Sequence, residues 1–400
     1  MTFLYALVII SMIAQVLGFW LVVRNYRFVI NKAERNRTSF CPKTALIIPC
    51  KGIDTEFEKN VSSFYKIDYK DYEIIFVTES QQDPAYNQLL AIREKIQNQT
   101  KAFKISVVAA GISTKGAQKL HNQLFGCSMI SKDVKMFAFA DSDACVRQNW
   151  LNELVYPLRK DKHGISSGYR WYVPLKNNFA TLAVSILNAK VAQLLGATIF
   201  NQAWGGSMAV SVENFKKLGM EKIWDTAVSD DLTLSRAAKK AGMKVFFVPA
   251  CFVASYEEFD TPRFFEFARR QFLLTRITSP GTWLFGLLTC IYMVFAFWGF
   301  AGVAIYLKLA DFSHWYIFLL AAFLSLSGQF FNAALRQKMI CEIFPADWSR
   351  LKTAAIADIL FSPVWAFLML LCILSSSFGR TIQWRGIKYK LISPTEVERI

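Results

Sequence analysis

The sequence MFAFADSD occupies residues 136–143 and decides the fold. Its first five residues form an apolar run of strand length, and two carboxylates, Asp141 and Asp143, follow at once. Two side chains at i and i+2 can face one ion only where the chain turns, as it does at the end of a strand. Carboxylate oxygens suit Mg²⁺ or Mn²⁺ rather than zinc, and Mg²⁺ often completes its shell with substrate phosphates. The stretch therefore predicts a divalent-cation site at Asp141 and Asp143, with a nucleotide diphosphate as the natural third partner.

Residues 44–255 alternate between strand-like and helix-like segments. The strand patterns cover Thr44–Pro49, Tyr72–Thr78, Ile105–Ala109 and Met136–Ala140, and helical patterns end at Phe64 and cover Pro84–Gln97 and Ala117–Met129. This alternation predicts an α/β fold with a mostly parallel sheet and helices on both faces. Ligands of such sheets bind beyond the carboxyl ends of the strands. Polar clusters stand at three of these ends, namely 49–51, 79–83 and 141–143.

The composition indicates an integral, multi-pass membrane protein. The chain has 400 residues, of which 54% are hydrophobic and 15% aromatic. Four stretches without a charged residue reach the length that a spanning helix needs: Thr2–Val23, Gly281–Leu307, Trp315–Leu335 and Ile359–Gly379. Pro363 interrupts the last stretch, which favours a re-entrant or interfacial hairpin there and a C-terminal tail on the cytoplasmic side.

Basic residues set the predicted orientation. Five of them follow the first apolar stretch: Arg24, Arg27, Lys32, Arg35 and Arg37. The positive-inside rule then places the following domain in the cytoplasm. The net charge of +16 fits contact with an anionic leaflet, whereas no basic, aromatic-interleaved module indicates nucleic acid. The simple spans and short tail favour a bacterial inner membrane over the Golgi.

We divide the chain into five segments on these grounds. They are an N-terminal transmembrane helix (1–24), a basic juxtamembrane linker (25–43), a cytoplasmic catalytic domain (44–279), C-terminal membrane helices (280–379) and a basic tail (380–400). Within the catalytic domain, residues 182–200 are apolar except for Lys190. This segment is either a core helix or a helix in the membrane interface, beside the active site, where a lipid could enter.

A second acidic pair, Asp230-Asp231, opens the helical pattern Leu232–Ala241. One interpretation is a helix cap, in which Ser229 or Asp230 accepts hydrogen bonds from backbone N–H groups. The functional interpretation makes one of the two aspartates a general base. It would take a proton from an acceptor hydroxyl as that oxygen attacks a sugar anomeric carbon.

Arg269 and Arg270 lie in a basic, aromatic stretch just before the second apolar segment. They are either a positive-inside anchor or guanidinium ligands of a diphosphate, and one helix could serve both purposes.

Several of these motifs together resemble the ceramide glucosyltransferases, which are membrane-bound GT-A enzymes that transfer glucose from UDP-glucose to ceramide. The resemblance runs from the first apolar stretch to Lys390. The motifs that carry it are Pro49-Cys50-Lys51-Gly52-Ile53-Asp54, Asp83-Pro84-Ala85, Asp141-Ser142, Asp230-Asp231 and Trp384-Arg385 with Tyr389-Lys390.

The resemblance implies roles for individual residues. Asp231 is the expected base, Asp141 and Asp143 hold Mg²⁺ or Mn²⁺ and the diphosphate, and Asp83 contacts the nucleotide. Further donor-side residues are Lys51, Lys119, Arg269 and Arg270. The turn Trp204-Gly205-Gly206 corresponds to a glycine turn on the acceptor side, for which backbone geometry alone is another explanation.

The chain also departs from the family pattern. Members of the family can carry Gly where this chain has Asp143, so a two-carboxylate metal site is better supported here. The family's (Q/R)-x-x-R-W motif is degraded, because Gln271 and Phe272 stand at its last two positions. This departure argues against a diphosphate contact through that motif, and Arg269 or Arg270 would make the contact instead.

We therefore predict an inverting glycosyltransferase that moves a sugar, with glucose favoured, from a UDP-sugar to a lipid hydroxyl such as that of ceramide. The alternatives are the same chemistry on a hopanoid or diacylglycerol, and a non-catalytic membrane protein that retains the fold. The degraded motif at Gln271 and Phe272 is the main support for the non-catalytic alternative.

Overall fold

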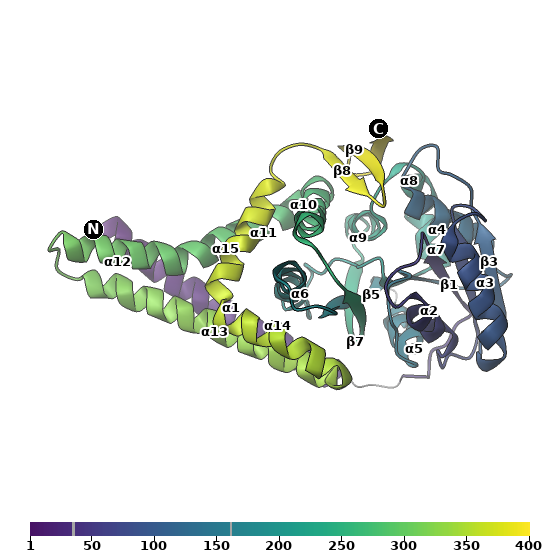
Figure 1. Ribbon diagram of the computed structural model, residues 1–400, viewed down its shortest axis with the longest axis horizontal. Coiled ribbons are helices and arrows are strands. Elements are labelled where there is room, and N and C mark those ends of the chain that lie inside the picture. Colours follow the sequence, from purple (N-terminus) through teal and green to yellow (C-terminus); the bar gives the residue numbers. More distant parts are fainter. Residues whose placement is uncertain (34–36, 161) are drawn as a thin grey trace.

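The computed structural model describes residues 1–33, 37–160 and 162–400. An elongated arm of apolar helices joins an α/β domain, and a small sheet near the C-terminus lies against that domain (Figure 1). Arg35, which entered the predicted membrane orientation, lies outside the described residues.

A seven-stranded sheet of order β3-β2-β1-β4-β6-β5-β7 forms the centre of the α/β domain. Its strands are β1 (Thr44–Pro49), β2 (Tyr72–Thr78), β3 (Lys104–Ala109), β4 (Met136–Ala140), β5 (His163–Pro174), β6 (Ser207–Ser211) and β7 (Lys244–Glu257). Strands β1 to β4 pair in parallel, as do β5 and β7, whereas β6 runs antiparallel to both of its neighbours. The predicted α/β fold with a mostly parallel sheet is confirmed.

Two cores cover the two faces of this sheet, because successive side chains of a strand point to opposite sides. Leu46 and Ile48 of β1 face the first core, and Ala45 and Ile47 face the second. The first core contains α2 (Phe57–Tyr65), α3 (Pro84–Ile96) and α5 (Trp150–Val155). The second contains α4 (Gln118–Ser128), α7 (Val212–Lys217), α8 (Met220–Thr226) and α9 (Asp230–Lys240).

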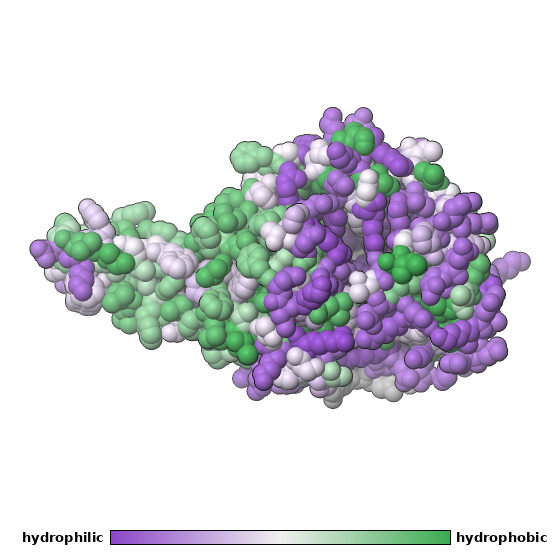
Figure 2. Space-filling model, viewed as in Figure 1, coloured by the Kyte–Doolittle hydropathy of each residue, from purple (hydrophilic) through white to green (hydrophobic). Residues whose placement is uncertain are grey.

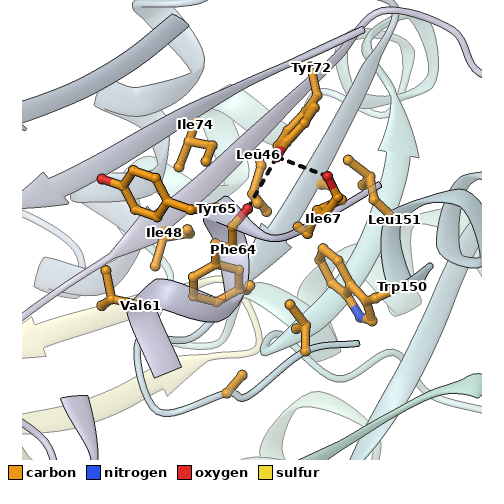
Figure 3. Close-up of a cluster of buried hydrophobic side chains, with 14 of the residues drawn as sticks. Leu46, Ile48, Val61, Phe64, Tyr65, Ile67, Tyr72, Ile74, Trp150 and Leu151 are labelled. Carbon is orange, nitrogen blue, oxygen red and sulfur yellow. Dashed lines mark hydrogen bonds between the residues drawn. The ribbon is translucent and has the colours of Figure 1, made fainter. Parts of the chain in front are cut away.

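Figure 3 shows part of the first core, where side chains of β1, β2, α2 and α5 meet. The hydrogen bonds drawn in this view are those of the Tyr72 hydroxyl. Its hydroxyl donates to the carbonyls of Phe64, at 3.2 Å, and Ile67, at 3.4 Å. A buried hydroxyl without such partners would destabilise the fold, so these bonds allow the ring of Tyr72 to fill the core.

Three helices among the described residues are long and apolar enough to cross a membrane: Thr2–Ala33 (α1), Pro280–Leu309 and Trp315–Ile343 (α13). The second consists of α11 (Pro280–Val294), a π turn at Phe295–Gly299 and α12 (Phe300–Leu309). Their side chains form the hydrophobic surface of the arm (Figure 2).

The fourth apolar stretch of the sequence, Ile359–Gly379, contains the second helix of a bent pair and the end of the first. A short turn at Pro345–Asp347 leads into α14 (Trp348–Leu360), which meets α15 (Ser362–Ser375) at 90°. Pro363 stands in the first turn of α15, where its missing N–H breaks no helical hydrogen bond. Helix α15 alone has 14 residues, fewer than a spanning helix needs.

The predicted linker of residues 25–43 begins as helix, because α1 continues to Ala33. Asn25 donates hydrogen bonds to the carbonyls of Gln193 and Leu194, both at 3.2 Å. Val29 and Ala33 are buried in a core shared with β5 and β7. The expected linker boundary at residue 25 was wrong because packing against the catalytic domain, which charge does not reveal, extends the helix.

The apolar segment 182–200 divides into two parts. Helix α6 (Phe179–Ala192) buries most of its side chains, as a core helix does. The exposed apolar side chains lie beyond it, where Ile199 is 70% exposed and Phe200 77% exposed. The core interpretation fits the burial of α6, and the exposed apolar side chains of this segment lie at its end.

Residues 380–400, interpreted from the sequence as a basic tail, form an antiparallel sheet of β8 (Thr381–Trp384), β9 (Ile387–Ser393) and β10 (Glu396–Arg399). Ile382, Tyr389 and Leu391 are buried in the second core of the catalytic domain. This sheet also contacts α10 (Thr261–Thr278). The end of the chain is thus part of the catalytic domain.

A buried ion pair lies between two helices of the arm, and its arginine also binds the catalytic domain. Arg336 of α13 forms two hydrogen bonds with Asp358 of α14, at 2.6 and 2.8 Å, and a third with Gln193 after α6, at 2.6 Å. Gln337 donates to the same carboxylate at 2.7 Å. Such a pair contributes little when complete, but its loss on one side leaves a buried charge without a partner.

We therefore predict that Asp358→Leu lowers the free energy of unfolding by about 3–5 kcal/mol, because the guanidinium of Arg336 is left buried and unpaired. Thermal unfolding of the detergent-solubilised protein measures the change. The double variant Arg336→Met/Asp358→Leu removes both charges and should recover most of the loss. A single variant as stable as the wild type would contradict the prediction.

Candidate active site

The candidate site lies at the carboxyl end of β4, where the antiparallel strand β6 begins. Ala140, the last residue of β4, pairs with Ser207, the first residue of β6. The turn that precedes β6 is therefore brought beside Asp141, which directly follows β4. This edge of the sheet is where α/β proteins bind ligands.

Glycines allow that turn to approach the carboxylates closely. A Cβ on Gly206 would lie 2.7 Å from Asp141 Oδ2 and 2.1 Å from the Trp204 ring. A Cβ on Gly205 would lie 2.5 Å from Asp230 Oδ2. The structure thus brings the predicted acceptor-side residues, Trp204, Gly205 and Gly206, to the acidic cluster, and the lack of side-chain atoms makes this approach possible.

Lys119 on α4 bridges two of the acidic residues. Its Nζ lies 2.7 Å from Asp141 Oδ1 and 2.9 Å from Asp230 Oδ2. Burial alone would lower the pKa of Lys119, but the two carboxylates raise it above the ordinary value. Burial would likewise raise the pKa of Asp141, but Lys119 and Arg170 hold it below the ordinary value. Both groups are therefore charged.

Arg170 on β5 connects the two carboxylates of the opening motif, and our sequence analysis did not identify it. Its guanidinium lies 2.9 Å from Asp141 Oδ2, 3.3 Å from Asp143 Oδ2 and 4.5 Å from the centre of the Trp204 ring. The sequence signal that could have identified it is a charged residue between two aromatic residues, Tyr169 and Trp171, in a buried strand.

Asp143 keeps one carboxylate oxygen available. Its Oδ1 is buried and has no hydrogen-bond partner among the described residues. Burial and the nearby carboxylate of Asp141 raise the pKa of Asp143, whereas Arg170 opposes that change. A buried acceptor without a partner is uncommon, and a bound cation is one group that would satisfy it. Asp141 and Asp143 therefore fit the predicted metal site, although the described residues hold no cluster of three or more His, Cys, Asp or Glu ligands.

Asp231 lies at the start of α9 and faces the glycine turn. Its Oδ2 accepts a hydrogen bond from the N–H of Gly205 at 3.1 Å, and its Oδ1 accepts from the hydroxyl of Ser229 at 2.6 Å and from the N–H of Leu232 at 2.7 Å. Burial, together with the adjacent charge of Asp230, raises the pKa of Asp231 to about 6. Such a value suits a general base near neutral pH.

Asp230 belongs to the cluster as well. Its Oδ2 accepts from Gln123 Nε2 at 2.8 Å besides the ion pair with Lys119. The hydroxyl of Ser229 accepts from the N–H of Leu232 at 3.2 Å and so caps α9. The cap that the sequence suggested is therefore made by Ser229, which shares the N–H of Leu232 with Asp231, whereas Asp230 takes no part in it.

The remaining donor-side residues surround this cluster at greater distance. Asp83 caps α3, since its Oδ1 accepts from the N–H groups of Ala85 and Gly52, each at 2.9 Å. The hydrogen bond from Gly52 also fixes the turn after β1. Lys51 in that turn pairs with Glu79 at 2.7 Å.

Arg269 and Arg270 of α10 bind the C-terminal sheet. Arg269 donates to the carbonyls of Thr381 and Phe378, at 3.1 and 2.9 Å, and Arg270 donates to the carbonyl of Gln383 at 3.2 Å. The structure thus brings Lys119, Asp141, Asp143 and Asp231 together but engages these two guanidinium groups elsewhere.

Comparison with solved structures finds glycosyltransferases. The mannosyltransferase PcManGT from Pyrobaculum calidifontis, in complex with GDP-Man and Mn²⁺, is 15% identical with a TM-score of 0.48, and the match covers 93% of this chain and 96% of that one. GalNAc-T7 with UDP, GalNAc and Mn²⁺ is 14% identical with a TM-score of 0.41, over 60% of this chain and 48% of that one. TarS residues 1–349 of S. aureus are 11% identical with a TM-score of 0.35, over 89% of this chain and 98% of that one.

The sequence itself is matched by the model of glycosyl transferase family 21 over residues 3–397. The match includes the apolar helices, the catalytic domain and the C-terminal sheet. This chain therefore belongs to glycosyl transferase family 21 and is a glycosyltransferase.

Proposed function

We propose that this glycosyltransferase moves glucose from UDP-glucose to the hydroxyl of a membrane lipid such as ceramide, with inversion at the anomeric carbon. The observation that carries the proposal is the buried acidic cluster beside the glycine turn, because Gln202 just before that turn binds Thr282 of the apolar helix α11. The family membership and the resemblance to ceramide glucosyltransferases support the choice of sugar and lipid.

Asp231 is the proposed base. Its carboxylate takes the proton of the acceptor hydroxyl while that oxygen forms a bond to the anomeric carbon. The bond from this carbon to the diphosphate breaks in the same step, and UDP leaves with the electron pair. A single displacement from the face opposite to UDP inverts the anomeric centre. The pKa of about 6 leaves Asp231 deprotonated at neutral pH and ready to accept a proton.

The donor is proposed to lie between the ends of β1 and β4. Asp83 contacts the nucleotide, and Lys51 and Lys119 contribute positive charge on the donor side. Asp141 and Asp143 hold Mg²⁺ or Mn²⁺, which would neutralise charge on the departing diphosphate. The unpaired Oδ1 of Asp143 supports this assignment.

The acceptor is proposed to arrive from the membrane. Leu194, Ile199 and Phe200 expose apolar side chains after α6. Gln202, which follows them, donates to the hydroxyl of Thr282 in α11 at 3.2 Å. A lipid that leaves the bilayer beside these residues meets the turn at Trp204 next. Arg269 and Arg270 fix the C-terminal sheet that forms another wall of the site.

The proposed orientation places the catalytic domain in the cytoplasm, with a bacterial inner membrane favoured over the Golgi. Arg24, Arg27, Lys32 and Arg37 near the end of α1 support it through the positive-inside rule. The C-terminal sheet would lie on the same side, because it packs on the catalytic domain.

The purified protein with UDP-glucose, Mn²⁺ and ceramide should release UDP and form a glucosylated lipid that mass spectrometry detects. Diacylglycerol and a hopanoid serve as alternative acceptors in parallel reactions, and excess EDTA should stop the release. If one of these two lipids is glucosylated and ceramide is not, that lipid replaces ceramide as the proposed acceptor. No product from UDP-glucose with any of the three lipids would overturn the proposed donor and acceptors.

Asp231→Asn should lower kcat by about 10²- to 10⁴-fold, because the amide cannot take the proton of the acceptor. UDP binding, measured by calorimetry, should persist. Asp225→Asn is the matched control, since Asp225 pairs with Lys115 on the surface, outside the cluster. Normal turnover by Asp231→Asn would remove Asp231 from the proposed role.

The rate of transfer should rise with pH, because the raised pKa of Asp231 keeps this base protonated in acid. Below about 6 Asp231 is protonated and inactive as a base, so kcat/KM should rise through pH 6 and level off above it. Asp230→Asn removes the adjacent negative charge and should shift the midpoint to lower pH. A profile that is flat from about pH 5 to 8 would contradict the assignment.

A further inference from the structure

The turn of the C-terminal sheet places an arginine where glycine or asparagine is usual. Trp384 pairs with Ile387, so Arg385 and Gly386 are the two residues of the hairpin turn. Both have positive φ angles, 50° for Arg385 and 81° for Gly386. Turns of this kind favour Asn, Asp or Gly at the first position, because a larger side chain is disfavoured there. The turn itself therefore gives no reason for an arginine.

The side chain of Arg385 reaches the carboxyl edge of the central sheet. Its Nη2 lies 2.5 Å from Asp54 Oδ1, and Asp54 Oδ2 accepts from the hydroxyl of Ser142 at 2.7 Å. Ser142 stands between the two proposed metal ligands. The tip of the hairpin therefore lies where the ends of β1 and β4 meet.

Several contacts hold the hairpin in this position. Arg270 binds the carbonyl of Gln383, and the hydroxyl of Tyr389 accepts from the N–H of Gln118 at 3.4 Å. The ring of Trp384 lies 5.8 Å from Lys119 Nζ. The hairpin is thus anchored on α10 and α4, and the pair with Asp54 is not the only contact that keeps it there.

Arg385 differs from the other two cations of the site. Lys119 and Arg170 each contact two carboxylates and are largely buried. Arg385 contacts one carboxylate, and its side chain is 46% exposed, whereas that of Asp54 is 8% exposed. Part of its guanidinium can therefore meet a ligand without breaking the acidic cluster.

We propose that Arg385 binds the diphosphate of the nucleotide-sugar donor. The guanidinium presents a planar pair of N–H donors that matches phosphate oxygens, and it exchanges or shares its contact with Asp54 when the donor enters. Asp54 adds a fifth carboxylate to the four of the cluster, and a further cation beside them would favour the binding of a diphosphate. The inference deepens the proposed function and rests on it, since it assumes a donor that carries a diphosphate.

Calorimetry of the full chain in detergent, with Mn²⁺ and with UDP or UMP as the ligand, tests the inference. Arg385→Gln should weaken UDP binding by about 10- to 100-fold, as the loss of charge-assisted hydrogen bonds predicts. UMP binding should change less, so that the preference for UDP over UMP falls. Arg385→Lys keeps the positive charge without the planar pair of N–H donors and should give an intermediate affinity for UDP.

Two variants separate ligand binding from a structural role. Lys388→Gln removes the same charge from an exposed position of β9 and should leave UDP binding unchanged. Asp54→Asn breaks the ion pair but keeps Arg385, so UDP should bind at least as tightly as in the wild type. Equal weakening by Asp54→Asn and Arg385→Gln would mean that the ion pair only holds the hairpin, and would overturn the inference.

The remaining outcomes distinguish this inference from the proposed function. UDP binding that Arg385→Gln leaves unchanged overturns the role of Arg385 and leaves the proposed donor intact. A wild-type protein that binds no UDP overturns the proposed donor, and the role of Arg385 with it.

Discussion

The site depends on the ammonium group of Lys119, which lies between the carboxylates of Asp141 and Asp230. These two aspartates belong to distant parts of the chain, the end of β4 and the start of α9. Buried carboxylates repel one another, and the site tolerates four of them only because Lys119 and Arg170 stand between them. Two cations against four carboxylates leave the cluster acidic. That imbalance is a physical reason for the site to take a divalent cation.

The sequence predicted those features that local patterns encode. Strands β1, β2 and β4 have the predicted bounds, because each contains an apolar run that polar residues follow. Parallel strands end at one edge, which is why residues 49–51, 79–83 and 141–143 follow strands at the same side of the sheet. Lys119 and Asp231 reach Asp141 and the glycine turn from α4 and α9. The reversed direction of β6, the contact of Arg170 with two aspartates and the C-terminal sheet were not predicted, since each depends on pairing between residues far apart in the chain.

The membrane arm and the catalytic cluster are connected through α6. Gln193, at the end of this helix, accepts from Arg336 in the arm and, through its carbonyl, from Asn25 of α1. Earlier in α6, Asn188 donates a hydrogen bond to the carbonyl of Arg170 at 3.0 Å. A continuous set of contacts therefore runs from the arm to the residue that joins Asp141 and Asp143. This double role is consistent with the burial of most of α6, whereas Ile199 and Phe200 after it are exposed.

The bend between α14 and α15 has a consequence for the site at the other end of α15. If the two helices were collinear, the chain would leave in the direction of α14, and β8 would be far from α10. The 90° bend instead carries α15 back beside α11, where Trp283 Nε1 donates to the hydroxyl of Ser376 at 2.9 Å. The chain then passes the arginines of α10 and forms the sheet that bears Trp384 and Arg385. The break in this apolar stretch, which hydropathy alone would suggest is an imperfect span, thus allows the end of the chain to reach the candidate active site.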